Sequence, residues 1–398
     1  MYILSLVGNW FLREHRGSLN PRIQRLEALL NRIGLLDSGE SANTVFSRLV
    51  EWLRANAAPK ELGMEITFNE FGIPVYTPKI VIGKKEKSDE QVPIEMVSHD
   101  EAFSILDTAL AENRLTAWVV MDRLDESFVG RPDIEIPALR ALVRAFMDLH
   151  PYEHIQVKLF VRNDLFKKIT QKGFVNLTHV NARRTEIEWE ESDLLEMICH
   201  RIRSSGEVLR YAGLNRLYGK ALFYSIFPTK VDTSTTWKWM LGQIRDGNRV
   251  YAPRNLIDLC GFAQEFQIKK DRNSSRELAP NVPIIEGDSI KKAAVKLSNQ
   301  RFSDTLMAEY GDDVKIAIKA FENGKAEYTE DNLTALFSFS DPVQTRLVAR
   351  ILCDVGFLEQ SGETYRVPLL YRPALNITKG KANNGIPAVN KIVGNKHL

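Results

Sequence analysis

Hydrophobic positions recur with a helical period near the start of the chain. With Asn20 as the helix cap and Pro21 in the first turn, apolar residues follow at every third or fourth position up to Ile33, which predicts an amphipathic helix. The same pattern predicts a second helix over residues 45–53. Over residues 64–82 the pattern changes to alternation, rich in β-branched and aromatic residues, so one or two strands are expected there.

The middle of the chain alternates helices with apolar strands. A capped helix is predicted at 98–113, and the run LTAWVVMD at 115–122 is apolar up to its last residue, as in a strand buried on both faces of a parallel sheet. A helix at 137–149 leads to a second such strand at 155–162, and a short third strand is predicted at 174–183. This rhythm predicts an α/β layer with right-handed crossovers.

Beyond this layer the strand signals fade and helices dominate. Together with a polar, proline-containing stretch, this change predicts five segments. They are an α/β domain at 1–206, a helical lid at 207–272, a linker at 273–289, a helical and winged-helix domain at 290–372, and a basic tail at 373–398.

The winged-helix prediction depends on a helix that is followed by a hairpin. Pro342 begins the helix, Gly356 ends it, and Ser361 with Gly362 forms the turn of a two-stranded ribbon. Helix followed by ribbon is the winged-helix pattern.

Two arginines on this helix are candidate DNA contacts. Arg346 and Arg350 are four residues apart and therefore share a face, from which guanidinium groups can reach phosphates or base edges. The alternative is a packing or oligomerisation module with a solvated tail. The predicted buried stripe consists of Val343, Leu347, Ile351 and Leu352.

Composition limits the class of protein only weakly. A chain of 398 residues is expected to hold two or three domains. Its 53 basic and 51 acidic side chains nearly balance, so global charge gives no argument for nucleic acid. The three cysteines have no metal-site spacing and are expected to be buried thiols of a cytoplasmic protein. The apolar first dozen residues lack the basic residues that precede a signal-peptide core.

A cluster of acids follows the first apolar strand, in VVMDRLDESF at residues 119–128. Asp122 stands at the strand tip, and Asp125 and Glu126 follow within one turn. Acids at this place lie at the carboxyl edge of a parallel sheet, where open α/β folds bind ligands. Carboxylate oxygens suit Mg²⁺, and a second carboxylate can activate water. The alternative is a strand that ends in solvated acids.

A hydrophobic strand followed by D-x-L-D-E resembles the extended Walker B motif of the signal-transducing (STAND) and AAA-like P-loop ATPases. The resemblance implies a parallel-sheet nucleotide domain that binds ATP and Mg²⁺. It implies that Asp122 coordinates magnesium through water and that Asp125 with Glu126 supplies the catalytic carboxylate.

Other parts of the chain extend the resemblance over roughly residues 90–370. IQVKLFVRND is similar to the strand whose polar end senses the γ-phosphate, which implies that role for Arg162, Asn163 or Asp164. YAPRNL is similar to the lid sequence of the family and implies a phosphate contact by Arg254. An arginine in an ordinary first helical turn is the alternative.

The phosphate loop of this family, G-x-x-x-x-G-K-[ST], has no counterpart in the sequence. None of the four Gly-Lys pairs is followed by Ser or Thr. The chain is therefore either a truncated ATPase or a degenerate relative, and truncation is the expectation. We expect the chain alone to bind ATP weakly and to be inactive, and an upstream reading frame to add the missing strand and loop.

The expected function is that of a cytoplasmic, prokaryotic switch that binds and hydrolyses ATP. Such a switch couples its nucleotide state to assembly or to partner binding, and the partner is itself, another protein or DNA. The alternative is a non-catalytic DNA- or protein-binding module on a degenerate ATPase scaffold.

Overall fold

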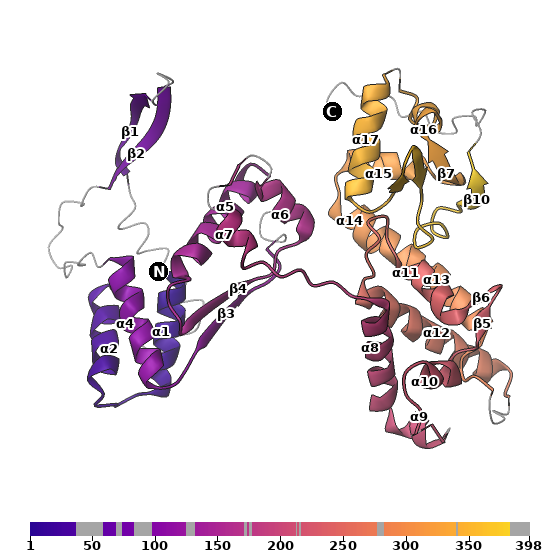
Figure 1. Cartoon of the computed structure of the whole chain (residues 1–398), viewed down its shortest axis with the longest axis horizontal. Coiled ribbons are helices and arrows are strands. Elements are labelled where there is room, and N and C mark those ends of the chain that lie inside the picture. Colours follow the sequence, from indigo (N-terminus) through magenta and orange to yellow (C-terminus); the bar gives the residue numbers. More distant parts are fainter. Residues whose placement is uncertain are drawn as a thin grey trace. The chain divides into compact units, whose positions relative to one another are not determined.

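The computed structural model divides the chain into two units, Met1–Arg184 and Thr185–Leu398. Each unit has a hydrophobic core of its own, and Figure 1 shows their elements. The structure describes residues 1–36, 98–124, 132–170, 173–174, 177–211, 213–214, 216–276, 282–339 and 341–382, and the backbone alone of 59–68 and 74–82.

Three helices form one layer of the first unit. They are α1 (Tyr2–Glu14), α2 (Pro21–Arg32) and α4 (His99–Glu112). The Asn20 side chain accepts the N–H of Arg22, at 2.8 Å, and thereby caps α2 as predicted. The apolar faces of the three helices meet in a core whose fully buried members include Leu4, Phe11 and Leu106. The predicted helix at 45–53 lies outside the described residues.

Two parallel strands lie against these helices. β3 (Ala117–Met121) pairs with β4 (Ile155–Leu159), and α5 (Pro132–Leu149) connects them. The predicted strand–helix–strand unit is therefore confirmed. Residues at alternate positions, such as Val119 and Val157, pack into the core with the three helices.

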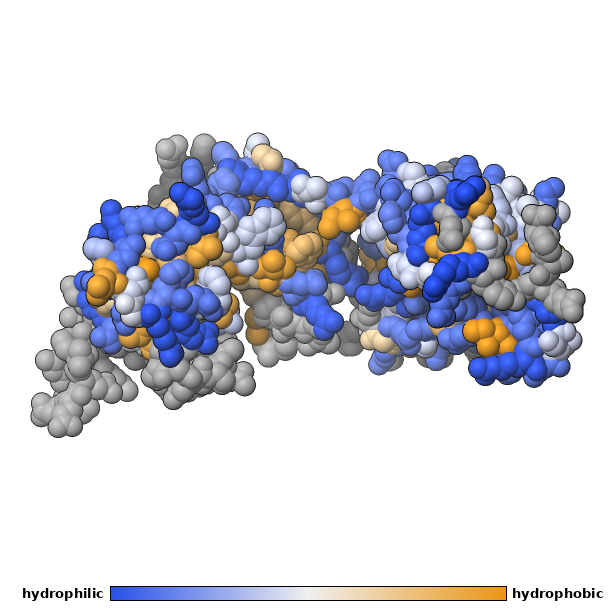
Figure 2. Space-filling view, turned by 90° about the horizontal axis from the view of Figure 1, so that it is seen from below, coloured by the Kyte–Doolittle hydropathy of each residue, from blue (hydrophilic) through white to orange (hydrophobic). Residues whose placement is uncertain are grey.

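The other face of β3 is open to solvent, so the prediction of a strand buried on both faces is wrong. Trp118 is 66% exposed and Val120 is 57% exposed. Hydrophobic residues are visible among hydrophilic ones on the surface of the first unit in Figure 2. A continuous apolar run shows that both faces carry apolar residues, but it does not show that both faces are covered.

Two further predictions concern short elements of the first unit. The alternating pattern predicted one or two strands over 64–82, and the structure has two, β1 (Pro59–Phe68) and β2 (Pro74–Ile82), which pair antiparallel. Two short helices follow β4, namely α6 (Asn163–Thr170) and α7 (Leu177–Asn181). The strand predicted over 174–183 is wrong, because Leu177 and the buried Val180 are spaced for one helical turn rather than for a strand.

The second unit begins with a helical part. Its longest helices, α12 and α13, pack side by side. The elements are α8 (Glu191–Ser204), α9 (Gly206–Tyr211), α10 (Gly219–Ile226), β5 (Lys230–Val231), β6 (Ser234–Thr235), α11 (Thr236–Ile244), α12 (Pro253–Asn273), α13 (Gly287–Arg301), the π-helical turn Phe302–Leu306 and α14 (Met307–Glu309).

A sheet of four strands with three helices ends the described chain. β7 pairs antiparallel with β9, β9 forms the predicted hairpin with β8, and β10 lies parallel to β7. The helix predicted from Pro342 is confirmed as α17. The elements are α15 (Asp312–Lys319), β7 (Lys325–Thr329), α16 (Glu330–Phe337), α17 (Pro342–Asp354), β8 (Glu359–Ser361), β9 (Thr364–Arg366) and β10 (Thr378–Lys381).

One continuous apolar core joins these two parts, from Leu194 to Ala382. The boundaries predicted after residues 206, 272 and 289 therefore fall inside a single unit. The described part of the predicted linker is packed as well. Arg276 pairs with Asp271 and Glu286, and Ile285 is buried.

A turn after α11 contacts the end of α17. The Gly247 N–H donates to the carbonyl of Gly356, at 2.7 Å. Within the turn, Asp246 Oδ1 accepts the N–H groups of Asn248 and Val250, each at 2.9 Å. Burial raises the pKa of the Asp246 carboxyl, although these bonds and Arg245 act in the opposite direction.

Asp246→Asn is expected to stabilise the second unit at neutral pH. The raised pKa means that the folded state favours the uncharged Asp246 carboxyl. The ionised carboxylate therefore destabilises the folded state once pH rises above the ordinary pKa of an aspartate. Asparagine keeps Oδ1 as an acceptor and carries no charge. Denaturant unfolding of both proteins from acidic to neutral pH should show curves that converge in acid and separate as pH rises. A variant less stable than the parent at neutral pH would show that the charge itself is needed.

Candidate functional site

The carboxyl edge of β3 and β4 collects the polar residues that the sequence singled out. The strands are in register, with Met121 opposite Leu159, and the Phe160 N–H donates to the Met121 carbonyl at 2.9 Å. Asp122 therefore follows one strand, and Arg162 and Asn163 follow the next, at the same edge. The parallel pairing therefore brings the segments that carry these three predicted site residues to one edge of the sheet.

Asp122 is exposed at the tip of β3. Its Oδ1 accepts the backbone N–H of Arg123, at 2.8 Å. Arg123 has a φ of 56°, which turns the chain sharply away from the strand direction. Asp125 and Glu126, the predicted catalytic carboxylates, lie outside the described residues.

Arg184 is a member of this edge that the sequence did not reveal. Its Nη2 donates to Asn163 Oδ1, at 2.9 Å, and its guanidinium lies over the Phe166 ring, 4.6 Å from the centroid. These two contacts hold a cation beside the end of β4. The adjacent pair Arg183 and Arg184 was the available signal, but pattern alone did not place it at the sheet edge.

The charges at this edge suit an anion together with a hard cation. Arg184 brings a guanidinium group that is held at Asn163, Asp122 brings one carboxylate, and Arg123 and Arg162 follow the ends of the two strands. Guanidinium groups bind phosphate oxygens in pairs, and a carboxylate is an oxygen ligand of the kind magnesium prefers. Within the described ranges no three His, Cys, Asp or Glu side chains form a metal-binding group.

No described Gly-Lys pair has the setting of a phosphate loop. Gly219-Lys220 begins α10, Gly324-Lys325 begins β7, and Gly380-Lys381 lies in β10, all in the second unit. Gly83-Lys84 lies outside the described residues.

Arg254 is exposed in the first turn of α12, directly after Pro253. The start of this helix is held by Arg301, whose Nε donates to Asn255 Oδ1 at 2.6 Å. Arg301 also pairs with Asp258. Arg254 belongs to the second unit, whereas the residues of the sheet edge belong to the first.

Arg346 and Arg350 are exposed on α17, as predicted. Arg346 Nη1 pairs with Glu330 Oε1 of α16, at 2.7 Å.

The predicted buried stripe of this helix is correct for Leu352, which is fully buried, but wrong for Val343 and Leu347, which are 60% and 51% exposed. The helix is rotated about its axis relative to the prediction, so that Thr345 faces the core. Its polar hydroxyl can be buried there because it lies 3.0 Å from the Thr334 hydroxyl and forms a hydrogen bond with it. The side chains that face the core are Thr345, Val348, Ala349 and Leu352.

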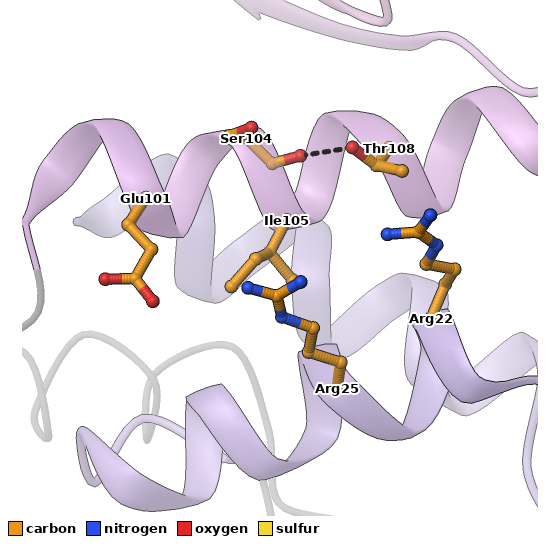
Figure 3. A pocket seen from close by; sticks show the side chains of 6 residues that line it. All are labelled: Arg22, Arg25, Glu101, Ser104, Ile105 and Thr108. Atoms are coloured by element: carbon orange, nitrogen blue, oxygen red, sulfur yellow. Dashed lines mark hydrogen bonds between the residues drawn. The ribbon is translucent and has the colours of Figure 1, made fainter.

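A shallow pocket of about 170 Å³ lies between α2 and α4. In Figure 3, Arg22 and Arg25 of α2 face α4 across it. Arg22 Nε pairs with Glu112 at 3.1 Å, and the Thr108 hydroxyl donates to the Ser104 carbonyl at 2.7 Å. Because Arg22 and Thr108 already make contacts between and within the two helices, we describe the pocket as a groove of the helical layer.

No helix in the described part of the chain is both long and apolar enough to cross a membrane. Comparisons with protein-family models, with curated proteins and with solved structures found no match.

Proposed function

We propose that the first unit is a nucleotide-binding α/β domain of the P-loop type and that its ligand is ATP with Mg²⁺. The observation that supports the proposal is the parallel register of β3 and β4, because it brings the strand ends that precede Asp122 and Arg162 to one edge of the sheet. Open α/β sheets bind ligands at this edge. Arg184, held against Asn163, adds positive charge for a polyphosphate.

Each residue has a proposed role. Asp122 would hold magnesium through water, and Arg162 and Asn163 would contact the terminal phosphate. Bound magnesium would neutralise charge on the phosphates. Glu126, with Asp125, would orient and deprotonate the attacking water.

The described residues fit this ligand only in part, because they include no phosphate loop. Asp122 by itself repels a triphosphate, so the arginines must supply the attraction. We therefore propose weak binding of ATP by this chain, strengthened when a phosphate loop is supplied in a longer chain.

Calorimetric titration with ATP, with and without magnesium, tests the proposal. We expect weak, magnesium-dependent binding that Asp122→Ala reduces about tenfold, because the variant loses a charged oxygen ligand. Asp148→Ala is the matched control, since Asp148 is an exposed acid near the end of α5, the helix that runs back from the carboxyl edge. Binding that ignores magnesium, or that is equal in both variants, would contradict the assignment.

A second function is favoured by the order of elements at the end of the chain. We propose that α15, β7, α16, α17, β8 and β9 form a winged helix, in which α17 holds the position of a recognition helix. Arg346 and Arg350 would then contact DNA. Charge argues against this contact, since residues 312–366 contain ten acidic and six basic side chains.

Phosphate release from ATP separates an ATPase from a non-catalytic module. A magnesium-dependent rate would support hydrolysis by Glu126 and Asp125. Nucleotide binding without a measurable rate would favour the degenerate scaffold.

A further inference from the structure

The open face of β3 and β4 carries an apolar platform made of Trp118, Val120 and Phe160. The odd-numbered residues of both strands pack into the core, so the even-numbered residues lie on the other face. On that face Trp118 is 66% exposed, Val120 is 57% exposed, and Phe160, directly after β4, is 46% exposed. The Lys158 ammonium lies over the Trp118 ring, 5.3 Å from its centroid. The two strands therefore contribute side chains to one surface.

The platform reaches the carboxyl edge of the sheet, where the candidate site lies. Asp122 follows Val120 by two residues, and the Phe160 N–H donates to the Met121 carbonyl at 2.9 Å. At about 3.3 Å per residue, Trp118 lies about 13 Å from Asp122 along the strand. An extended nucleoside triphosphate can cover this span from its base to its terminal phosphate.

The size of the platform argues against a second copy of the chain as its occupant. From the exposed fractions of its side chains, the platform offers on the order of 300 Å² of apolar surface. A stable protein–protein contact buries about 800 Å² on each partner. One flat ring of the size of a nucleobase fits the smaller area.

The charges around the platform suit a base that carries phosphates. Aromatic side chains stack on nucleobases, and cationic side chains beside them attract phosphates. Lys158 is exposed on the same face, and Arg184 is held at the end of β4 by its bond to Asn163. An apolar peptide on the platform would leave these two cations without a counter-ion.

We propose that the platform binds the base of the nucleotide, with the adenine ring of ATP stacked on Trp118 and the triphosphate directed along the sheet toward Asp122. Lys158 would move from the Trp118 ring to the phosphate nearest the ribose, and Phe160 would pack against the ribose. The inference rests on the proposed function, because it takes the phosphates to lie at the carboxyl edge. Stacking itself needs no phosphate, so adenosine alone should bind to the same ring.

Calorimetric titration of the full chain with magnesium-ATP, magnesium tripolyphosphate and adenosine tests the proposal. Trp118→Ala should weaken the binding of ATP about tenfold, because a stacked base is lost, and should leave the binding of tripolyphosphate unchanged. Trp118→Phe keeps an aromatic ring and should restore most of the affinity for ATP. Trp10→Ala is the matched control, since Trp10 of α1 is 43% exposed and should bind all three ligands like the parent.

The three ligands distinguish failure of the base site from failure of the phosphate site. If the parent binds ATP and tripolyphosphate but Trp118→Ala binds ATP equally well, the platform does not hold the base, whereas the proposed function stands. Binding of adenosine that depends on Trp118, without binding of tripolyphosphate, would keep the base site and overturn the proposed function. A parent that binds neither ATP nor adenosine overturns both. Tighter binding of single-stranded oligothymidylate than of ATP, lost in Trp118→Ala, would assign the platform to nucleic acid and overturn the proposal.

Discussion

Gly247→Ala is expected to destabilise the second unit by about 3 kcal/mol or more, because backbone atoms fill the space that a methyl group needs. A Cβ at Gly247 would lie 2.4 Å from the Leu358 carbonyl oxygen and 2.7 Å from that of Gly356. The Gly247 N–H also donates to the same Gly356 carbonyl, at 2.7 Å. The turn cannot retreat without losing this bond, and the carbonyls belong to the segment that joins α17 to β8.

Gly261→Ala is the matched control and should shift stability in the opposite direction. Gly261 lies inside α12, and a Cβ there meets nothing within 4 Å. Alanine in a helix interior is favoured over glycine by about 0.5 to 1 kcal/mol. Urea unfolding of the parent and both variants measures the two shifts. Parent-like stability of Gly247→Ala would show that the turn does not pack on the end of α17.

Local signals in the sequence predicted the helices well. Asn20 caps α2, and the Ser98 hydroxyl accepts the Glu101 N–H at the start of α4, at 3.1 Å. Caps of this kind satisfy N–H groups that the helix leaves free, so their effect is local and can be read from a few residues. The hairpin turn at Ser361 and Gly362 was predictable for the same reason, since Gly362 has a φ of 60°.

Tertiary arrangement was harder to predict, because it depends on residues far apart in sequence. The apolar run before Asp122 correctly predicted a strand but not its exposed face, where Trp118 lies. On α17 the presence of Thr345 in the core depends on a partner hydroxyl from α16. Helical periodicity alone cannot anticipate such a partner, and it therefore assigned Val343 and Leu347 to the core in place of Thr345 and Val348, although it placed Leu352 correctly.

The candidate site was predicted in part. The sequence placed Asp122 and Asn163 after successive strands, and the parallel register brings their strand ends to one edge. Arg184 was missed because it contacts Asn163, which lies 21 residues earlier in the chain at the start of α6. The roles of Asp125 and Glu126 remain predictions.

The composition of the sequence predicted a lid, a linker and a winged-helix domain within the second unit. Composition does not show how these segments pack. The polar stretch before α13 suggested a linker, yet Arg276 ties it to α12 through Asp271. Buried residues from α8 to β10 share one core. A polar segment whose charges are paired can thus connect two parts that share one core, and we predict that these parts unfold cooperatively.

Phe321→Ala tests that cooperativity and should destabilise the second unit by about 3 to 5 kcal/mol, the range for loss of a buried aromatic ring. Phe321 is fully buried. Its ring centroid lies 5.0 Å from that of Tyr328, 5.9 Å from that of Phe337 and 5.1 Å from that of Phe357. Alanine would leave a cavity among three rings that cannot close it without moving the strands and helices that hold them.

Hydrogen exchange measured by mass spectrometry shows how far the effect of Phe321→Ala spreads. In one cooperative unit, amides of α8 and α12 lose protection together with those of α16 and α17, although α8 lies far from Phe321 in sequence. Helices α1, α2 and α4 serve as the internal reference, because they pack in the separate core of the first unit. Ile316→Ala, at a side chain that is 48% exposed, should leave the exchange pattern close to that of the parent. If α8 and α12 keep parental protection while α16 and α17 lose it, the second unit divides near residue 272 after all, since the helical part would then be stable without the aromatic cluster.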